Sequence, residues 1–311
     1  MSEPYLGTHI VHLTDTTDDN AKLKIRSAYA LHKGRLGIHG DVDVVGATNT
    51  LLVGTKASEL ITNTQRPDRL IIAVNVAPPD KKDGTTDNAR RPFYIADLGN
   101  GVTVGGTSSG LEFSYIRPLI KDFYELTTTN SKGSQFRSLE ILPEAVLGFA
   151  DAKRRGELIA DGTLKKVRNI DAIVPAVPDR THVMEVDNFN NVKLWVTQRD
   201  KAALEAAAKA KTDVRVTFAE YSVELLAAKT IEKHAPDPKH VLTPFSALAT
   251  PTLFKAPLGT NLVALSSSSR RTDGEVIPFI ATMREFPAET KPNYPAPRVG
   301  AAVELAFGAP R

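Results

Sequence analysis

The chain contains 311 residues, with 39 Lys and Arg against 36 Asp and Glu and a formal net charge of +3. This length suits about two domains, and so small a net charge gives no reason to expect a nucleic-acid partner. The absence of cysteine excludes disulfides, thiolate metal sites and cysteine nucleophiles. No apolar run approaches the ~20 residues of a membrane-spanning helix, and the polar first residues do not resemble a signal peptide. We therefore expect a cytoplasmic protein with no membrane partner.

The first half of the chain alternates between patterns typical of strands and of helices. Strands are expected at residues 9–14, 42–45, 69–76, 93–96 and 102–104, and helices at residues 19–33, 50–61 and 142–155. The segment 69–76 is apolar almost throughout, which is typical of a strand buried on both faces. Because strands separated by helices of about 10–15 residues form βαβ units, residues 1–164 are predicted to form an α/β domain with a mainly parallel central sheet.

The second half of the chain has a different pattern. Residues 165–180 contain two prolines and little periodicity, which predicts a linker. Short β-type runs follow, at residues 183–186, 192–197, 214–218, 261–265, 276–281 and 302–307, and an Ala-rich stretch at residues 201–211 predicts one helix. Many short strands with turn signals between them predict a smaller, all-β, barrel-like domain over residues 181–311.

The sequence LTDTTDDN places three carboxylates where the first predicted strand ends and the first helix begins. In open α/β sheets, ligands bind outside the carboxyl ends of the strands, so Asp15, Asp18 and Asp19 are well placed for a site. Carboxylates there can accept hydrogen bonds from ribose hydroxyls or hold a hard cation. The alternative is helix capping by Asp18 or Asp19, which does not account for Asp15 at the strand end.

Three other patterns are weaker. The glycine-rich segment 99–110 lacks the Lys-Ser/Thr ending of a phosphate-binding loop and is better explained by turns within a β segment. The sequence VDNFNNV at residues 186–192 could pair an ammonium group, stack on a base and read its edge, but it also fits an ordinary turn. The seven histidines show no HExxH-like spacing, so no metal site is expected.

The order of these patterns resembles the family of S-adenosylmethionine-dependent halogenases (fluorinase and chlorinase) and S-adenosylmethionine hydroxide adenosyltransferases. The segments that carry the resemblance are, in chain order, LTDTTDDN, RPFYIADLGNG, QFRSLEILPEAVLGFA, VDNFNNV, TQRDKAALEAA, NLVALSSSSRRTDGEV and APRVGAAVEL. The resemblance implies an α/β N-terminal domain, a β-barrel-like C-terminal domain and a homotrimer with sites between subunits. It also implies that S-adenosylmethionine is a substrate attacked at its ribose C5′, with methionine leaving and no cofactor required.

On this resemblance, the N-terminal domain would supply the ribose and nucleophile contacts. Asp15 would hold the ribose hydroxyls, and Asp18 and Asn20 would lie near the methionine end. Phe136 and Ser138 would line the pocket of the nucleophile. A sulfonium is already an excellent leaving group, so the site would act by aligning the nucleophile and removing water rather than by acid–base chemistry.

The C-terminal domain of a neighbouring subunit would hold the rest of the ligand. The resemblance implies that Asp187 pairs with the methionine ammonium group, Phe189 stacks on adenine and Asn191 reads the adenine edge. Ser269 and Arg270 would bind the methionine carboxylate, although the arginine that follows matches this position nearly as well. The turn around Asp187 is one residue shorter than in the family and has asparagine where glycine is expected.

The chain departs from the family at the positions that activate water. The hydroxide-transferring members carry an aspartate where this chain has Val76 or the alanine after it, and a histidine where it has Arg137. Only an arginine is retained, Arg90 or its neighbour, and Ser138 stands where the halogenases place a halide-contacting serine. Arg90 and Ser138 are therefore the predicted catalytic residues, with water or hydroxide as the expected nucleophile.

Two alternatives remain open at this point. One is a non-catalytic, adenosyl-ligand-binding protein of the same fold, which the missing aspartate and histidine favour. The other is a calcium-dependent nucleoside hydrolase, because LTDTTDDNAKL resembles the Asp cluster of those enzymes and DVDVVGATNT faintly resembles their second segment. The first hypothesis, release of adenosine and methionine from S-adenosylmethionine, is independent of metal, and the nucleoside hydrolase is not.

Overall fold

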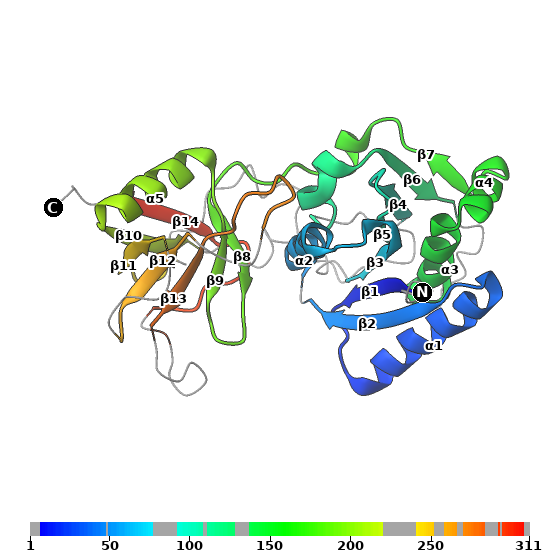
Figure 1. Cartoon of the computed structure of the whole chain (residues 1–311), viewed down its shortest axis with the longest axis horizontal. Coiled ribbons are helices and arrows are strands. Elements are labelled where there is room, and N and C mark those ends of the chain that lie inside the picture. Colours follow the sequence, from blue (N-terminus) through cyan, green and yellow to red (C-terminus); the bar gives the residue numbers. More distant parts are fainter. Residues whose placement is uncertain are drawn as a thin grey trace, which may run out of the picture. The chain divides into compact units, whose positions relative to one another are not determined.

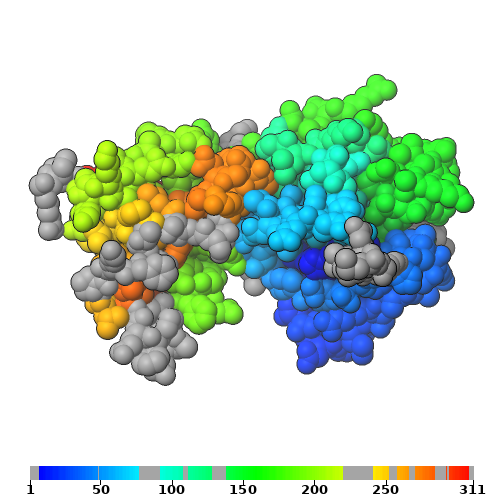
Figure 2. All heavy atoms as spheres, viewed as in Figure 1, coloured from blue at the N-terminus to red at the C-terminus, as the bar shows by residue number. Residues whose placement is uncertain are grey.

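A computed structural model describes residues 7–47, 49–76, 92–107, 111–127, 137–219, 241–251, 258–265, 270–283, 292 and 294–307. The chain divides into two compact units, Met1–Ala176 and Val177–Arg311, hereafter unit 1 and unit 2 (Figure 1). In the space-filling view unit 1 runs from blue to green and unit 2 from yellow-green to red, so each unit is one continuous stretch of chain (Figure 2).

Unit 1 is an α/β domain. Its strands are β1 (Thr8–Thr14), β2 (Gly40–Gly46), β3 (Leu70–Asn75), β4 (Phe93–Asp97), β5 (Thr103–Thr107), β6 (Asp122–Leu126) and β7 (Leu164–Lys166). Its α-helices are α1 (Asp19–Leu36), α2 (Thr50–Asn63), α3 (Arg137–Ala150) and α4 (Ala152–Ala160). The predicted alternation of strands and helices is confirmed for the first three strands and two helices, with ends that shift by one to three residues.

The strands of unit 1 form one mixed sheet in the order β2-β1-β3-β5-β4-β6-β7 within the described residues. Strands β2, β1, β3 and β5 pair in parallel, and β4 is antiparallel to both β5 and β6. β6 therefore runs in the direction of β5, and of these described strands only β4 and β7 run the other way. The sheet is thus parallel at its centre, as the periodicity predicts, with antiparallel strands inserted beyond β5.

Two apolar layers cover the faces of this sheet. Helices α1 and α3 pack side by side on one face, where Ile25 and Val146 meet Ile10 and Ile71 of the central strands. Helix α2 covers the other face, where Val53 joins a separate buried cluster with the alternate residues of β1 and β3. Because both faces are covered, β3 is buried almost throughout, which explains its nearly continuous apolar sequence.

A glycine allows α3 to approach the sheet closely. A Cβ atom built on Gly105 of β5 would lie 2.3 Å from Cγ1 of Val146, a separation that side chains do not adopt. The described part of the glycine-rich segment, residues 99–107, forms a turn and strand β5, which confirms the prediction of turns within a β segment. Residues 108–110 lie outside the described residues.

Two expectations for unit 1 differ from the structure. The helix expected at residues 142–155 is two helices, because the Asp151 carboxylate accepts a hydrogen bond from Arg154 N at 2.7 Å and so begins α4. The segment expected as a linker starts within unit 1, since β7 pairs with β6 and Val174 is buried in the same core as α2. Unit 1 accordingly extends to Ala176.

Unit 2 is a closed β-barrel with one covering helix in its described part. Its strands are β8 (His182–Val186), β9 (Val192–Trp195), β10 (Asp213–Ala219), β11 (Phe245–Thr250), β12 (Asn261–Ala264), β13 (Phe279–Thr282) and β14 (Ala302–Phe307), and its helix is α5 (Gln198–Ala210). Around the barrel the order is β10-β11-β12-β13-β9-β8-β14. The predicted barrel-like domain is confirmed, although β11 was not expected from the sequence.

The barrel interior is apolar. Inward-facing residues of the strands form one buried cluster, to which α5 adds Leu204, Ala207 and Ala208. In the part of the chain that the structure describes, no helix is both long and apolar enough to cross a membrane.

Candidate functional site

The parallel strands of unit 1 end together at one edge of the sheet. Thr14, the last residue of β1, pairs with Gly46 of β2 on one side and Asn75 of β3 on the other. The chain leaves β1 through α1 on one face of the sheet and reaches β3 through α2 on the other face. In doubly wound folds, two connections that leave on opposite faces of the sheet open a crevice between the adjacent strands, here the first and third, and ligands bind there.

Asp15 follows directly after β1, at this edge of the sheet. Its side chain is exposed, and one of its carboxylate oxygens accepts a hydrogen bond from the Thr16 hydroxyl at 3.3 Å. The loop is held to the sheet because Ala47 N donates to Thr14 O at 2.8 Å and Thr16 N donates to the Thr14 hydroxyl at 3.1 Å. The exposed Asp15 therefore follows β1 directly, where the sequence predicts that this strand ends.

Asp18 has a clear structural task. Its carboxylate accepts a hydrogen bond from Ala21 N at 2.9 Å and makes Asp18 the N-cap of α1. Asp19 is exposed in the first helical turn and pairs with Lys22 at 3.6 Å. Asn20 is also exposed in this turn. Capping is therefore confirmed for Asp18, and Asp15 is an exposed residue directly after the first strand.

Ser138 lies at the same edge as Asp15. The ion pair between Arg155 of α4 and Asp97 of β4, at 3.2 Å, places the α3–α4 junction at the opposite edge of the sheet, where β5 begins. Helix α3 packs along β3 and β5 and spans about 21 Å at 1.5 Å per residue. Its first turn, with the half-buried Ser138, is therefore at the carboxyl edge, above β3 and β5.

Asn75 is a candidate that the sequence reasoning missed. It ends β3 opposite Thr14 and shares the face of Ile71 and Ala73, on which the N-terminal turns of α1 and α3 also lie. Its side chain is half-buried and makes no hydrogen bond within the described residues. A polar residue closing an otherwise apolar strand was the signal that could have identified it. An amide here can orient a ligand but cannot act as a base at neutral pH.

Several predicted residues lie outside the described residues. These are Arg90, Phe136 and Ser269. Val76, one of the two positions that match the aspartate of the hydroxide-transferring members, is a buried apolar residue. Arg137 begins α3.

In unit 2, Asp187 organises a tight turn between β8 and β9. One oxygen of its carboxylate accepts hydrogen bonds from Phe189 N and Asn191 N, both at 2.8 Å, and the other accepts one from the Asn191 side-chain amide at 2.9 Å. Asn190 adopts the left-handed conformation with a φ of 60°, which replaces the glycine expected at this position. These contacts are those of the ordinary turn that the sequence also allows, and they occupy the carboxylate of Asp187.

The same turn exposes an aromatic ring. The Tyr294 hydroxyl donates to Asn190 O at 2.7 Å and anchors the turn to the barrel. Phe189 at its tip remains 48% exposed, which is unusual for a phenylalanine. A rigid turn with an outward-facing aromatic ring suits stacking on a planar ligand.

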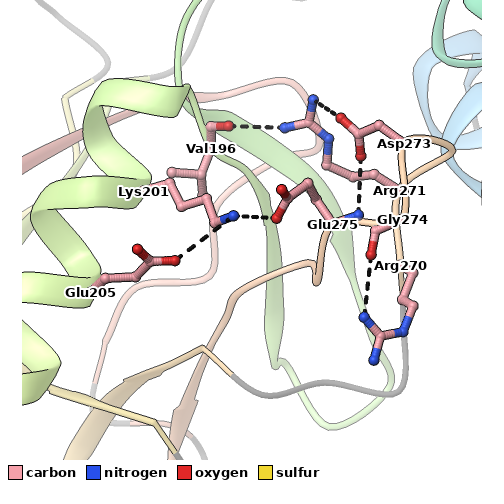
Figure 3. A network of polar contacts seen from close by, with 8 residues as sticks. All are labelled: Val196, Lys201, Glu205, Arg270, Arg271, Asp273, Gly274 and Glu275. Carbon is pink, nitrogen blue, oxygen red and sulfur yellow. Dashed lines mark hydrogen bonds and ion pairs between the residues drawn. The ribbon is translucent and has the colours of Figure 1, made fainter.

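The structure distinguishes Arg270 from Arg271. Arg271 is mostly buried, with its guanidinium 3.7 Å from the centre of the Trp195 ring and its Nη1 donating to Val196 O at 3.1 Å. Arg270 is exposed and donates to Gly274 O at 3.2 Å, within its own hairpin (Figure 3). Arg270 is therefore the arginine whose guanidinium can reach a ligand anion.

Comparison with known proteins supports the fold. No protein-family model matches the chain, and no curated protein matches it in sequence. Solved structures of an uncharacterized conserved protein from Thermotoga maritima and a conserved hypothetical protein from Thermus thermophilus are similar to it, with TM-scores of 0.60 and 0.54 and identities of 14% and 15%. Each comparison covers 96% of this chain and 100% of the other. At these identities the similarity shows the fold alone, and it extends over both units.

Proposed function

We propose that this protein binds S-adenosylmethionine and cleaves it by attack of water at the ribose C5′, giving adenosine and methionine. The observation that carries the proposal is the position of Asp15. It is an exposed residue at the carboxyl end of β1, between strands whose connections run on opposite faces of the sheet. A carboxylate at such a strand end accepts hydrogen bonds from ribose hydroxyls, and the crevice is the usual ligand position in this kind of fold.

The chemistry needs little from the protein. A new C5′–O bond forms as the C5′–S bond breaks, the sulfur keeps the bonding electron pair, and the water releases one proton. Because the sulfonium becomes a neutral thioether, positioning and removal of water are sufficient tasks for the site. Ser138 and Asn75, at the same edge as Asp15, are the described polar residues best placed to orient the attacking water. Arg90 is retained as a proposed catalytic residue from the family resemblance.

The proposed site also uses unit 2 of a neighbouring subunit in a homotrimer. Support comes from the exposed ring of Phe189 on a rigid turn and the exposed guanidinium of Arg270, which suit an adenine ring and a carboxylate. The turn contacts of Asp187 suggest that its main role in binding is to hold Phe189 and Asn191 in place.

A second candidate is a non-catalytic adenosyl-ligand-binding protein of the same fold. Val76 favours it, because a buried apolar side chain stands at one of the two positions matched to an aspartate in the hydroxide-transferring members. The two candidates share the ligand and differ only in turnover.

The test is incubation of the full chain with S-adenosylmethionine, with either EDTA or calcium present, followed by chromatography for adenosine and methionine. We expect both products at equal rates in the two conditions. Asp15→Asn should reduce turnover at least about 100-fold, whereas Asp19→Asn, which alters an exposed acid in the adjacent turn, should not. Binding without products would select the second candidate, and absence of binding would overturn both. Calcium-dependent release of ribose from a nucleoside would point instead to the nucleoside hydrolase.

A further inference from the structure

A short hairpin in unit 2 carries Arg270 and Arg271 side by side. Arg270 pairs with Val276 as an isolated antiparallel bridge, Arg271 N donates to Glu275 O at 2.7 Å, and Gly274 N donates to Arg271 O at 2.9 Å. The hairpin is therefore closed by its own backbone. These backbone contacts do not fix the orientation of the hairpin on the barrel. That requires contacts with other elements of unit 2.

Arg271 provides one attachment to the barrel. Its guanidinium lies against the indole of Trp195, donates to Val196 O and forms an ion pair with Asp273 at 2.8 Å. The side chain is only 14% exposed, and its Nε is buried without a hydrogen-bond partner within the described residues. A cation so placed costs desolvation energy, which a purely apolar contact at this position would avoid. A role of Arg271 in fixing the geometry of the hairpin would account for this cost.

A second attachment comes from α5. Lys201 forms an ion pair with Glu275 of the hairpin and another with Glu205 at 3.7 Å (Figure 3). The hydrogen bond with Glu275 raises the pKa of Lys201. The hairpin is consequently held on both of its strands, by Arg271 on one and Glu275 on the other.

These attachments leave Arg270 pointing away from the barrel. Neighbouring residues of an extended chain alternate in direction, so fixing Arg271 inward fixes Arg270 outward. Within the described residues, the Arg270 guanidinium donates only to Gly274 O, and the residue as a whole is exposed. A guanidinium with fixed direction suits two parallel hydrogen bonds to a carboxylate.

We propose that Arg271 is a positioning residue, which by stacking on Trp195 holds the 270–276 hairpin so that Arg270 is ready to bind the carboxylate of an amino-acid-bearing ligand. The identity of that ligand rests on the proposed function. Holding the guanidinium before binding reduces the ordering cost of association, so Arg271 contributes to affinity without touching the ligand.

Trp195 makes the proposal directly measurable, because it is the only tryptophan in the chain. Its fluorescence reports the guanidinium stack in the full-length protein and its response to ligands. We would titrate wild type, Arg270→Gln and Arg271→Lys with S-adenosylmethionine and with 5′-methylthioadenosine, which has the adenosyl part but no carboxylate. Calorimetry would give the dissociation constants independently of fluorescence.

Wild type should bind S-adenosylmethionine at least about tenfold more tightly than 5′-methylthioadenosine, which corresponds to about 1.4 kcal/mol. Arg270→Gln should remove this preference. Arg271→Lys keeps the charge but loses the planar stack, so it should shift the Trp195 emission and reduce the preference while leaving the affinity for 5′-methylthioadenosine unchanged. Asp273→Asn, which removes one partner of Arg271 and keeps the stack, should act in the same direction but more weakly.

The outcomes separate the two proposals. If Arg271→Lys or Asp273→Asn weakens both ligands equally, or neither, Arg271 has no positioning role, even though the proposed function stands. If wild type binds neither ligand, the proposed function fails and the carboxylate role of Arg270 fails with it. A preference that survives in Arg270→Gln would also overturn the inference, because Arg271 would then have no residue to position.

Discussion

The Nδ1 atom of His12 lies 3.1 Å from the hydroxyl oxygen of Tyr29, and this contact joins β1 to α1 in the interior of unit 1. Both side chains are fully buried, with their rings edge-to-face at 5.7 Å. The Nε2 atom of His12 is buried with no hydrogen-bond partner in the described part of the chain. Burial lowers the pKa of His12 to about 4, so the strand that leads to Asp15 contains a neutral histidine at physiological pH.

Stability should therefore fall as the pH is lowered from about 6.5 to 4. Burial also lowers the pKa of His182 in unit 2 to about 4. In this pH window both histidines bind a proton in the unfolded chain but not in the folded one, so protonation favours unfolding. The loss should be on the order of 3 kcal/mol for each histidine. Urea unfolding at several pH values measures it, and His12→Phe and His182→Phe should each flatten the dependence. A slope unchanged in both variants would contradict the burial argument.

Substitution of Asp18 should lower the stability of the protein, whereas substitution of Asp15 should not. Asp18→Ala removes the N-cap of α1 and should lower the free energy of unfolding by about 1 kcal/mol. Asp15→Asn should leave the free energy of unfolding nearly unchanged, because the side chain is exposed. Urea denaturation of the two variants beside wild type provides the comparison. Equal destabilisation would mean that Asp15 is needed for the fold, and would remove the main support for its role in binding.

The Asp187 turn allows a similar separation in unit 2. Asp187→Ala leaves two backbone N–H groups and one side-chain amide without their acceptor, and should destabilise the protein by about 1–3 kcal/mol. Phe189→Ala removes a ring that is half exposed, so its effect on thermal stability should be much smaller. Under the proposed function it should weaken adenosyl-ligand binding about tenfold, as measured by calorimetry. Unchanged affinity in Phe189→Ala would exclude this ring from the site.

Gly105 should be intolerant of even the smallest side chain. Gly105→Ala places a Cβ against Val146 and should cost about 1–3 kcal/mol, or force α3 away from the sheet. Gly156→Ala is the matched control, because its Cβ meets nothing within 4 Å on α4 and should stabilise the helix by about 0.5–1 kcal/mol. Thermal unfolding measures both changes. Partial recovery in Gly105→Ala with Val146→Ala would confirm the steric cause, and a stable single variant would refute it.

Much of the fold could be predicted because its signals are local. The alternation of strands and helices in unit 1 follows from periodicity, and the start of α1 follows from a side chain that caps backbone groups three residues away. Two of the features that the sequence did not predict depend on partners far along the chain. The antiparallel placement of β4 between β5 and β6 is one, and the inclusion of β7 in unit 1 is another. Neither pairing can be predicted from the residue pattern of the paired segments alone.

The sequence by itself determined most of the elements, the two-part organisation and the carboxylate at the end of the first strand, since each depends on residues close together in the chain. Only the tertiary structure decided that Asn75 stands beside Thr14, and that Arg271 stacks inward on Trp195 while Arg270 faces solvent. The physical reason is that two adjacent arginines have the same intrinsic chemistry. Their difference arises from the aromatic ring, carbonyl and carboxylate that folding brings to one of them.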